Sequence, residues 1–428
     1  MKGKVACCGH TPVRKGPLPT TYPGGVMIGE EEKRAVIEVM ESQALFRYYG
    51  PWGPSLNKVD AFEEEFAKYI GTDYALGVTS GTGALLTALV GAKVGPGDEV
   101  IVPAYTWIAD PAAVVVSRAI PVIAEVDKSL TLNPEDFEAK ITERTKAVIV
   151  VHMRGVGSKM NEIMEVARAN GITVIEDVSQ SCGASYKGKK LGSIGDIGVF
   201  SFQMKKVITA GEGGALTTND KSIYGRCVTY HDPIAQLRKI LPMFGVPSFV
   251  GINFRMSELA GAVALEQLRK LDKILNLQQR NKMQIKKGMA DIEGIELREI
   301  PDPEGDAAIC IIFFLPTPEQ ARAFVKGLRA ENIDGLGYGT HNVYTPEVED
   351  WHVYSYWKDI LQKNTVTAEG CPFTCPYYKG KIEYTTDLCP KTLAILGRAV
   401  HMDVSPLLTE EDIDQIIEGV HKVAKEVL

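Results

Sequence analysis

The sequence lacks the features that mark several broad classes of protein. No apolar run reaches the roughly 20 residues of a membrane helix, and the longest, from Val100, is interrupted by Pro103, Asp110 and Pro111. Basic residues are in the minority, with 47 lysines and arginines against 54 aspartates and glutamates and a net charge of -7. A nucleic-acid surface needs an excess of positive charge. We therefore expect neither a membrane nor a nucleic acid as a partner.

The cysteines show no spacing typical of a disulfide framework. All eight are scattered, which favours reduced thiols and a cytoplasmic location. Cys371 and Cys375 are close enough to bind zinc together, but only Cys389 and the distant His401 follow as further ligands. We therefore favour free thiols in a loop and predict no metal. No internal repeat or low-complexity tract is present either.

The sequence does contain a regular alternation of short apolar runs and helical patterns. From about Gly29 to Asp220, seven β-branched runs predict strands, and the amphipathic segments between them predict helices. This alternation favours an α/β fold with a mostly parallel sheet between helices. In such a sheet, ligands bind beyond the carboxyl ends of the strands. The runs lie at residues 72–80, 99–106, 120–127, 146–153, 172–178, 197–202 and 213–219.

We expect three parts along the chain. Residues 1–28 are an irregular extension, residues 29–293 a large domain that ends in a long helix, and residues 294–428 a smaller C-terminal α+β domain. The region from Gly335 to Gly397 gives no clear pattern. Within it, the aromatic stretch 345–359 could line a sugar site with its flat rings, or could pack the small domain.

Two strand ends could hold parts of a flat, anionic ligand. After the first run, Gly81, Thr82 and Gly83 open a helix, whose N–H groups could bind a phosphate or could belong to a simple capped turn. After the second run, Trp107 could stack on a ring or fill the core. Each of these features leaves both alternatives open.

Two further strand ends carry acid, amide and amine groups. Asp177 could hold the proton of a heterocyclic nitrogen or form a salt bridge, and Gln180 could reach a ring substituent. Ser201 could donate to a phosphate, and Lys205 or Lys206 could form an imine, because burial lowers the pKa of a lysine. One cofactor, pyridoxal 5′-phosphate (PLP), uses all of these groups together.

Longer motifs support this cofactor. The chain contains FEEEFAKYIGTDYALGVTSGTGALLTAL, GDEVIVPAYTW, VIEDVSQSCGASYKGKKLGSIGDIGVFSF, AGEGGALTTND and NFRMSELAGAVALEQLRKLD. In these motifs, which cover about residues 28–285, the sequence resembles the DegT/DnrJ/StrS family of sugar aminotransferases, PLP-dependent enzymes of fold type I. The resemblance implies transfer of an amino group from glutamate or glutamine to a keto- or aldehydo-sugar.

The resemblance also assigns roles to residues. The imine lysine of the family lies five residues after the serine of F-S-F and five before the first glycine of G-E-G-G, and both counts give Lys206. In the family, an asparagine of the neighbouring subunit reaches the phosphate, which implies Asn253 and a homodimer with shared active sites. The other implied cofactor contacts are Thr82, Gly83 and Ser201 at the phosphate, Asp177 at the ring nitrogen, Gln180 at the ring hydroxyl and Trp107 on the ring face.

The chain also departs from the family pattern. The pair Gln203-Met204 stands where the family often has His-Pro or Gln-Gln, and Val207 stands where it usually has Asn, and we expect both places at the mouth of the site. The motifs FRYYG, VHMRGVGSKMNEI and REIPDPEGD are similar to the branch that aminates an octulosonate-type sugar acid. A dehydratase branch has histidine in place of the lysine, so Lys206 favours transamination. A sugar dehydratase and a non-catalytic regulator of the same fold stay as alternatives.

Three more charged residues have two interpretations each. His152, at the end of a predicted strand, could contact the cofactor or substrate, or could be a hydrogen-bonded structural histidine. Arg47 and Arg154 could bind a substrate carboxylate through paired hydrogen bonds. For both arginines we favour ion pairing within the protein.

Overall fold

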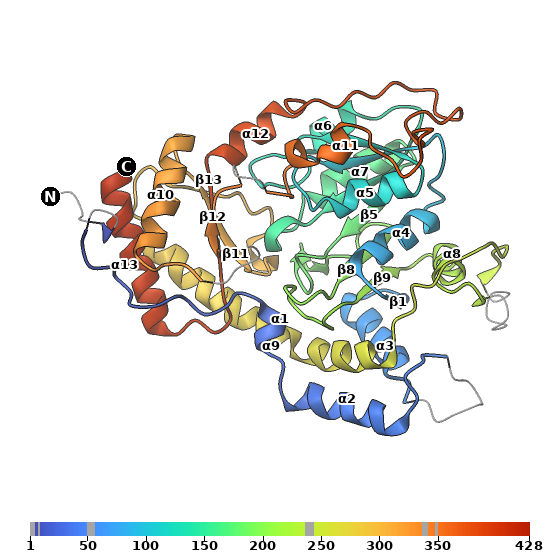
Figure 1. Ribbon diagram of the computed structural model, residues 1–428, viewed down its shortest axis with the longest axis horizontal. Helices are drawn as coiled ribbons and strands as arrows, with labels where there is room; N and C mark the ends of the chain where they lie inside the picture. The colour runs from blue at the N-terminus through green and yellow to red at the C-terminus, as the bar shows by residue number, and fades with distance from the viewer. Residues whose placement is uncertain (1–4, 7–8, 49–55, 236–243, 336–340, 347–349) are drawn as a thin grey trace.

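The computed structural model describes residues 5–6, 9–48, 56–235, 244–335, 341–346 and 350–428 (Figure 1). Residues 49–50 of the FRYYG motif and residues 347–349 of the aromatic stretch lie outside these ranges. Within the described residues no helix is both long and apolar enough to span a membrane. The chain forms a larger and a smaller lobe, and α9 (Glu258–Gly288) runs from one to the other (Figure 1).

The larger lobe is built on a seven-stranded sheet with the order β1-β9-β8-β5-β4-β2-β3. The pairs between β3, β2, β4, β5 and β8 are parallel, and only β9 pairs antiparallel with both of its neighbours. Every residue of β2, β3, β8 and β9 is buried, which is why these segments read as continuous apolar runs. The strands are β1 (Tyr74–Val78), β2 (Glu99–Pro103), β3 (Ile120–Ala124), β4 (Thr145–Val151), β5 (Thr173–Asp177), β8 (Ile197–Ser201) and β9 (Gly214–Thr218).

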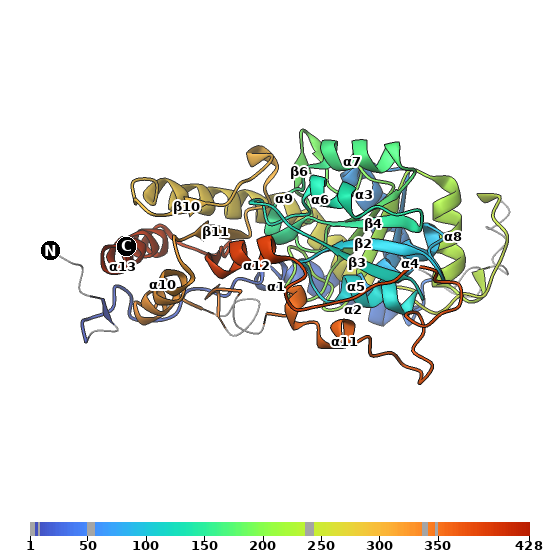
Figure 2. The ribbon, with the colours of Figure 1, turned by 90° about the horizontal axis from the view of Figure 1, so that it is seen from above.

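Helices cover both faces of this sheet. Figure 2 shows the sheet between α3, α6 and α7 on one side and α4 and α5 on the other. A small hairpin of β6 (Ser185–Tyr186) and β7 (Lys189–Lys190) precedes β8. The helices of this lobe are α1 (Pro23–Val26), α2 (Glu30–Ser42), α3 (Lys58–Ile70), α4 (Gly81–Gly91), α5 (Ala109–Val116), α6 (Pro134–Ala139), α7 (Met160–Ala169) and α8 (Lys221–His231).

The smaller lobe has a separate core around an antiparallel sheet with the order β10-β11-β13-β12. Two amphipathic helices share this core, and each begins at a threonine whose side chain accepts a backbone N–H, Thr317 or Thr409. The elements of this lobe are β10 (Glu296–Leu297), β11 (Cys310–Phe314), α10 (Pro318–Ala330), β12 (Val343–Tyr344), β13 (Ala399–Asp403) and α13 (Glu410–Val427).

The N-terminal segment packs on the smaller lobe, and part of the C-terminal half of the chain packs on the larger lobe. Val5 and Leu18 belong to the core of the smaller lobe. Residues 351–397, which include α11 (Lys358–Leu361) and α12 (Pro390–Gly397), return to the larger lobe, where Tyr354 and Trp357 are buried in the main core. The predicted α/β fold with a smaller C-terminal sheet is confirmed. The division at residues 28 and 293 stays a prediction.

Candidate active site

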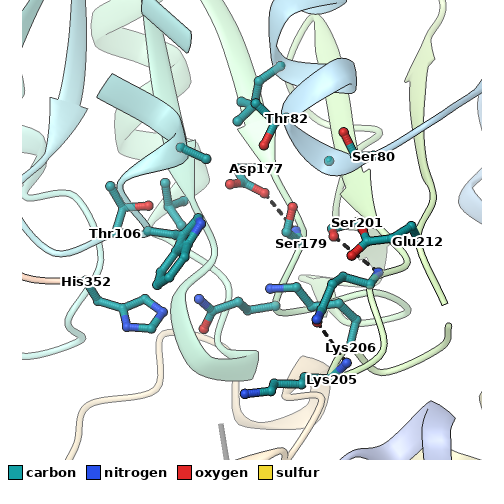
Figure 3. A pocket seen from close by; sticks show the side chains of 17 residues that line it. Ser80, Thr82, Thr106, Asp177, Ser179, Ser201, Lys205, Lys206, Glu212 and His352 are labelled. Carbon is teal, nitrogen blue, oxygen red and sulfur yellow. Dashed lines mark hydrogen bonds between the residues drawn. The ribbon is translucent and has the colours of Figure 1, made fainter. Parts of the chain in front are cut away.

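A cavity of about 290 Å³ lies at the carboxyl ends of the parallel strands (Figure 3). Its wall combines the loops after β1, β2, β5 and β8 with one residue of the returning C-terminal segment. The position agrees with the general rule for open α/β sheets. The cavity is lined by Ser80, Gly81, Thr82, Leu85, Thr106, Trp107, Ala109, Val151, Asp177, Ser179, Gln180, Ser201, Gln203, Lys205, Lys206, Glu212 and His352.

One end of the cavity is formed by the N-terminus of α4. Ser80 caps this helix, because its Oγ accepts the N–H of Gly83 at 3.0 Å. Thr82 lines the cavity together with Ser201, whereas Gly83 does not. A Cβ atom on Gly81 would lie 2.7 Å from the Cβ of Ser201, so only glycine fits between α4 and β8. The helix N-terminus and two hydroxyls suit an anion.

Both lysines of the loop after β8 line the cavity. Burial lowers the pKa of Lys206 to about 8, against the attraction of the Asp177 carboxylate. An amine with this pKa is in part neutral near pH 7.5 and can act as a nucleophile or base. The ammonium of Lys205 lies 5.4 Å from the ring centre of Tyr22. Lys205 therefore adds positive charge to the same cavity.

Asp177 and Gln180 come from the end of β5 and the turn that follows. The Ser179 N–H donates to Asp177 Oδ1 at 2.8 Å, so one carboxylate oxygen is held by the backbone. The backbone N–H of Arg154 donates to Gln180 Oε1 at 3.3 Å, which leaves the side-chain NH2 of Gln180 to donate into the cavity. Asp177 is only 6% exposed. This turn therefore presents an acid and an amide in fixed orientations.

Trp107 lines the cavity and is 45% exposed, so it does not fill the core. Its ring lies 5.0 Å from that of His352, centre to centre. His352 Nδ1 is paired with Asp350 at 2.6 Å, which orients the imidazole beside Trp107. The aromatic stretch 345–359 thus contributes His352 to the cavity, while its buried rings pack on the main core and not on the core of the smaller lobe.

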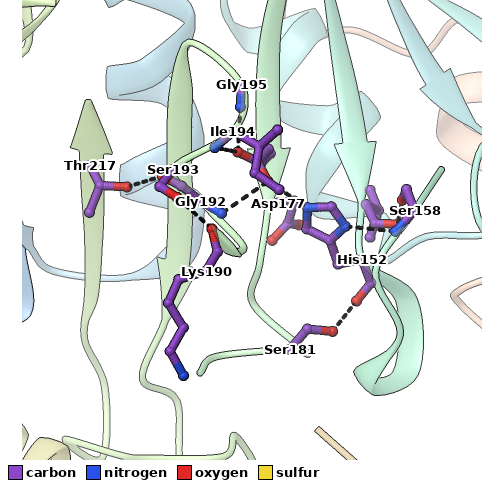
Figure 4. Close-up of polar contacts among 12 residues, drawn as sticks. His152, Ser158, Asp177, Ser181, Lys190, Gly192, Ser193, Ile194, Gly195 and Thr217 are labelled. Atoms are coloured by element: carbon purple, nitrogen blue, oxygen red, sulfur yellow. Dashed lines mark hydrogen bonds and ion pairs between the residues drawn. The ribbon is translucent and has the colours of Figure 1, made fainter. Parts of the chain in front are cut away.

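His152 is structural and is held in a network of polar contacts (Figure 4). It does not line the cavity. Its Nδ1 accepts the Ser158 N–H at 3.1 Å, and its Nε2 donates to the buried Glu176 at 2.9 Å. Glu176 in turn accepts the N–H groups of Gly192, Ile194 and Gly195 at 2.6–2.9 Å. This network ties β5 to the turn that leads into β8, and so fixes Asp177 relative to Ser201.

The two arginines considered as substrate ligands are buried in ion pairs. Arg47 pairs with Glu63 and Asp60, and Arg154 pairs with Asp403 of β13. Neither arginine lines the cavity, in agreement with the favoured interpretation.

The two cysteines of the possible zinc motif are free thiols, and no group of three or more metal-binding side chains occurs among the described residues.

Three predicted positions lie away from this cavity. Met204 packs near Gly25 of α1, and Val207 is buried in the main core, so the expectation that both line the mouth of the site is wrong. Asn253 lines a second cavity of about 260 Å³ with Phe46 and Arg255.

Several lining residues were not predicted. Ser80 and Ser179 adjoin predicted residues in the sequence, so the strand-end rule could have included them. Glu212 is a polar residue in a loop, and nothing in its local pattern separates it from surface residues. Gln203 and His352 lie in segments that the sequence already indicates as possible parts of the site, and both line the cavity.

These residues fit one cofactor. The cavity has an amine of lowered pKa, an acid beside it, an aromatic ring at its side and a helix N-terminus for a phosphate. The fold and this set of residues define a PLP-dependent aminotransferase of fold type I. The chain belongs to the DegT/DnrJ/EryC1/StrS aminotransferase family, whose sequence pattern residues 26–372 match.

Related proteins are consistent with this membership. The chain is 37% identical to a GDP-perosamine synthase of Caulobacter vibrioides over 272 residues, which are 61% of this chain and 68% of that protein. It is 34% identical to an L-glutamine:2-deoxy-scyllo-inosose aminotransferase of Streptoalloteichus tenebrarius over 66% of this chain and 67% of that one. The crystal structure of 3-amino-5-hydroxybenzoic acid synthase matches 96% of this chain and 99% of its own, with a TM-score of 0.78 and 25% identity.

Proposed function

We propose that this transaminase uses PLP to move an amino group from glutamate or glutamine to the carbonyl carbon of a keto- or aldehydo-sugar. One observation carries the proposal: Lys206, with its pKa lowered to about 8, lines the same cavity as Asp177, Gln180 and Trp107. Bound there, PLP supplies an aldehyde carbon that carries the amino group and a ring that withdraws electrons.

Each residue has a defined task in this proposal. Lys206 Nζ would hold the aldehyde carbon until the amine of the donor displaces it, and the freed neutral amine of Lys206 would then take the proton from the α-carbon of the donor. Asp177 keeps the proton on the ring nitrogen, and Trp107 covers a face of the ring. The phosphate of the cofactor would be held by the hydroxyl groups of Thr82 and Ser201 and by the N-terminus of α4, where we also predict a contact from Gly83.

The acceptor is inferred to carry negative charge. Lys205 and His352 both line the cavity, together with the acid Glu212. A carboxylate or phosphate on the sugar could pair with Lys205. An octulosonate-type sugar acid and a nucleotide sugar both have this chemistry, and the name of the related GDP-perosamine synthase supports a nucleotide-linked acceptor.

We also infer a homodimer with shared active sites and a cytoplasmic location. Asn253 lies beside the exposed apolar side chains of Val250 and Ile252, and its cavity is separate from that of Lys206. Apolar side chains exposed in one segment mark a surface that a partner covers. In the proposed dimer, Asn253 reaches the phosphate bound by the partner. The six described cysteines are all free, which supports a reducing compartment.

The test is to identify the lysine that binds the cofactor. Protein loaded with PLP is reduced with borohydride, digested and analysed by mass spectrometry. We expect the label on Lys206 in the wild type and in Lys205→Arg, the matched control, and no label in Lys206→Arg. Turnover of Lys206→Arg should fall by at least about a hundredfold, the usual scale of acid–base catalysis. A label on Lys205, or full activity of Lys206→Arg, would refute the assignment.

The acceptor is tested separately. Protein in the pyridoxamine form is mixed with candidate keto-sugars, and the visible absorbance of the aldehyde form is followed. Transfer of labelled nitrogen from ¹⁵N-glutamate to the sugar separates a transaminase from a dehydratase. Uncharged sugars that react as fast as acidic ones would contradict the proposed role of Lys205.

A further inference from the structure

A second acid, Asp110, is in contact with the cavity acid Asp177 but does not line the cavity. Asp110 lies in the first turn of α5 and is fully buried. Thr106, from the loop after β2, donates its hydroxyl to Asp110 Oδ2. The other oxygen, Oδ1, has no donor among the residues that the structure describes. A buried oxygen of this kind is costly and calls for an explanation.

The Asp177 carboxyl accounts for this oxygen. It lies within hydrogen-bond reach of the Asp110 carboxyl. Two ionised carboxylates in contact repel each other strongly in a buried site, so such a pair holds a proton between them. With that proton, Asp110 Oδ1 acquires a partner and the pair carries a single negative charge. Burial and the adjoining Asp177 carboxylate accordingly raise the pKa of Asp110 well above its usual range.

The surroundings decide which of the two acids keeps the proton. Asp177 accepts the Ser179 N–H at 2.8 Å and lines the cavity beside Lys206, and both neighbours stabilise a carboxylate. Asp110 has no exposure and one neutral hydroxyl as its donor. The charged groups that act on Asp110 are Asp177 from β5 and Lys206 from the loop after β8. Lys206 lowers the pKa of Asp110, but burial and the Asp177 carboxylate raise it by more.

We propose that Asp110 is a positioning residue: it stays protonated at neutral pH and donates a hydrogen bond to Asp177. This bond fixes the Asp177 carboxylate and disperses part of its charge. The consequence for catalysis rests on the proposed function. A carboxylate that already accepts a hydrogen bond on one oxygen competes less for the ring proton, so the proton stays on the nitrogen.

The first test needs no cofactor and no activity. Aspartate side chains are labelled with ¹³C, and the infrared spectrum of the apoprotein is recorded at pH 7. We expect the carboxylic-acid C=O band of one protonated aspartate in the wild type and its loss in Asp110→Asn. Absence of this band from the wild type, or its persistence in Asp110→Asn, would overturn the proposal. A wild-type spectrum without the band would refute the proposal however well the variant folds, and the variant assigns a band that is present to Asp110.

The second test uses the loaded enzyme and measures cofactor affinity and the pH midpoint of the cofactor absorbance. An asparagine at 110 can donate its NH2 to Asp177 and accept from Thr106, so Asp110→Asn should bind PLP within about twofold of the wild type. Asp110→Ala removes the donor and should lose about tenfold in affinity and move the midpoint by about one pH unit.

If Asp110→Asn behaved like Asp110→Ala, the proposed protonated state of Asp110 would be wrong. Asparagine can replace a protonated aspartate, but it cannot replace the charge of an ionised one. Failure of the wild type to bind PLP would instead refute the proposed function, and the infrared result would still decide the state of Asp110.

Discussion

The cavity lysine should reduce the stability of the apoprotein, and replacing it should therefore stabilise the fold. Lys206 is charged at pH 7 in the unfolded chain and for the most part in the folded one, yet its folded surroundings disfavour that charge. Methionine has a similar length and no charge. We therefore expect Lys206→Met to raise the free energy of unfolding at pH 7 while it abolishes transamination.

The size of the effect follows from the pKa. The value falls from 10.5 in the unfolded chain to about 8 in the folded protein, and at about 1.4 kcal/mol for each pH unit this amounts to roughly 3.5 kcal/mol. Between pH 8 and pH 10.5 the unfolded chain holds a proton that the folded protein has lost, so wild-type stability rises with pH. The advantage of Lys206→Met should shrink over the same interval.

The assay is urea unfolding of cofactor-free protein at several pH values from 7 to 10.5. Lys205→Met is the matched control, because it removes a lysine from the same loop and keeps Lys206, and it should show the pH dependence of the wild type. The reasoning would be refuted if Lys206→Met were less stable than the wild type at pH 7, or if the difference between them did not change with pH.

Two buried charge networks lead to further predictions. Burial alone would raise the pKa of Glu176, but His152 and the N–H groups of Gly192 and Gly195 lower it overall. Glu176→Gln should therefore reduce the free energy of unfolding by about 2–3 kcal/mol at pH 7. In urea unfolding this loss should diminish as the pH falls below 4.5, and a loss independent of pH would contradict the prediction. Arg154→Met leaves the Asp403 charge buried and should cost about 3–5 kcal/mol. Combining it with a replacement of Asp403 by leucine should recover most of that cost in thermal unfolding, and purely additive losses would disprove the coupling.

Much of the fold could be predicted from the sequence because the central sheet is buried on both faces. The predicted run at 197–202, for example, contains β8, whose five residues are all buried. The strand-end rule then pointed to Asp177 and to the pair Lys205 and Lys206, because parallel strands present their carboxyl ends at one edge, and the family resemblance chose Lys206. These two residues line one cavity although they come from different strands.

Other parts could not be predicted because they depend on contacts distant in sequence. Asp110 occurs in an apolar stretch, and only the folded protein shows that it contacts Asp177. His352 occurs among aromatic residues whose burial is decided by the larger lobe. Strand β12 has only two residues and pairs with β13, and β13 pairs with β11 only after the chain has returned from the other lobe.

The returning C-terminal segment has a consequence for synthesis of the protein. The Thr106 N–H donates to the His352 carbonyl at 2.8 Å, and the Tyr354 N–H donates to the Ala104 carbonyl at 2.9 Å, so one wall of the cavity joins early and late parts of the chain. At ribosomal rates these parts emerge on the order of tens of seconds apart. During that interval the loop after β2 in the nascent chain lacks these partners, and the cofactor site lacks one wall. The segment that contains His352 and Tyr354 must therefore be synthesised before the site can enclose its cofactor.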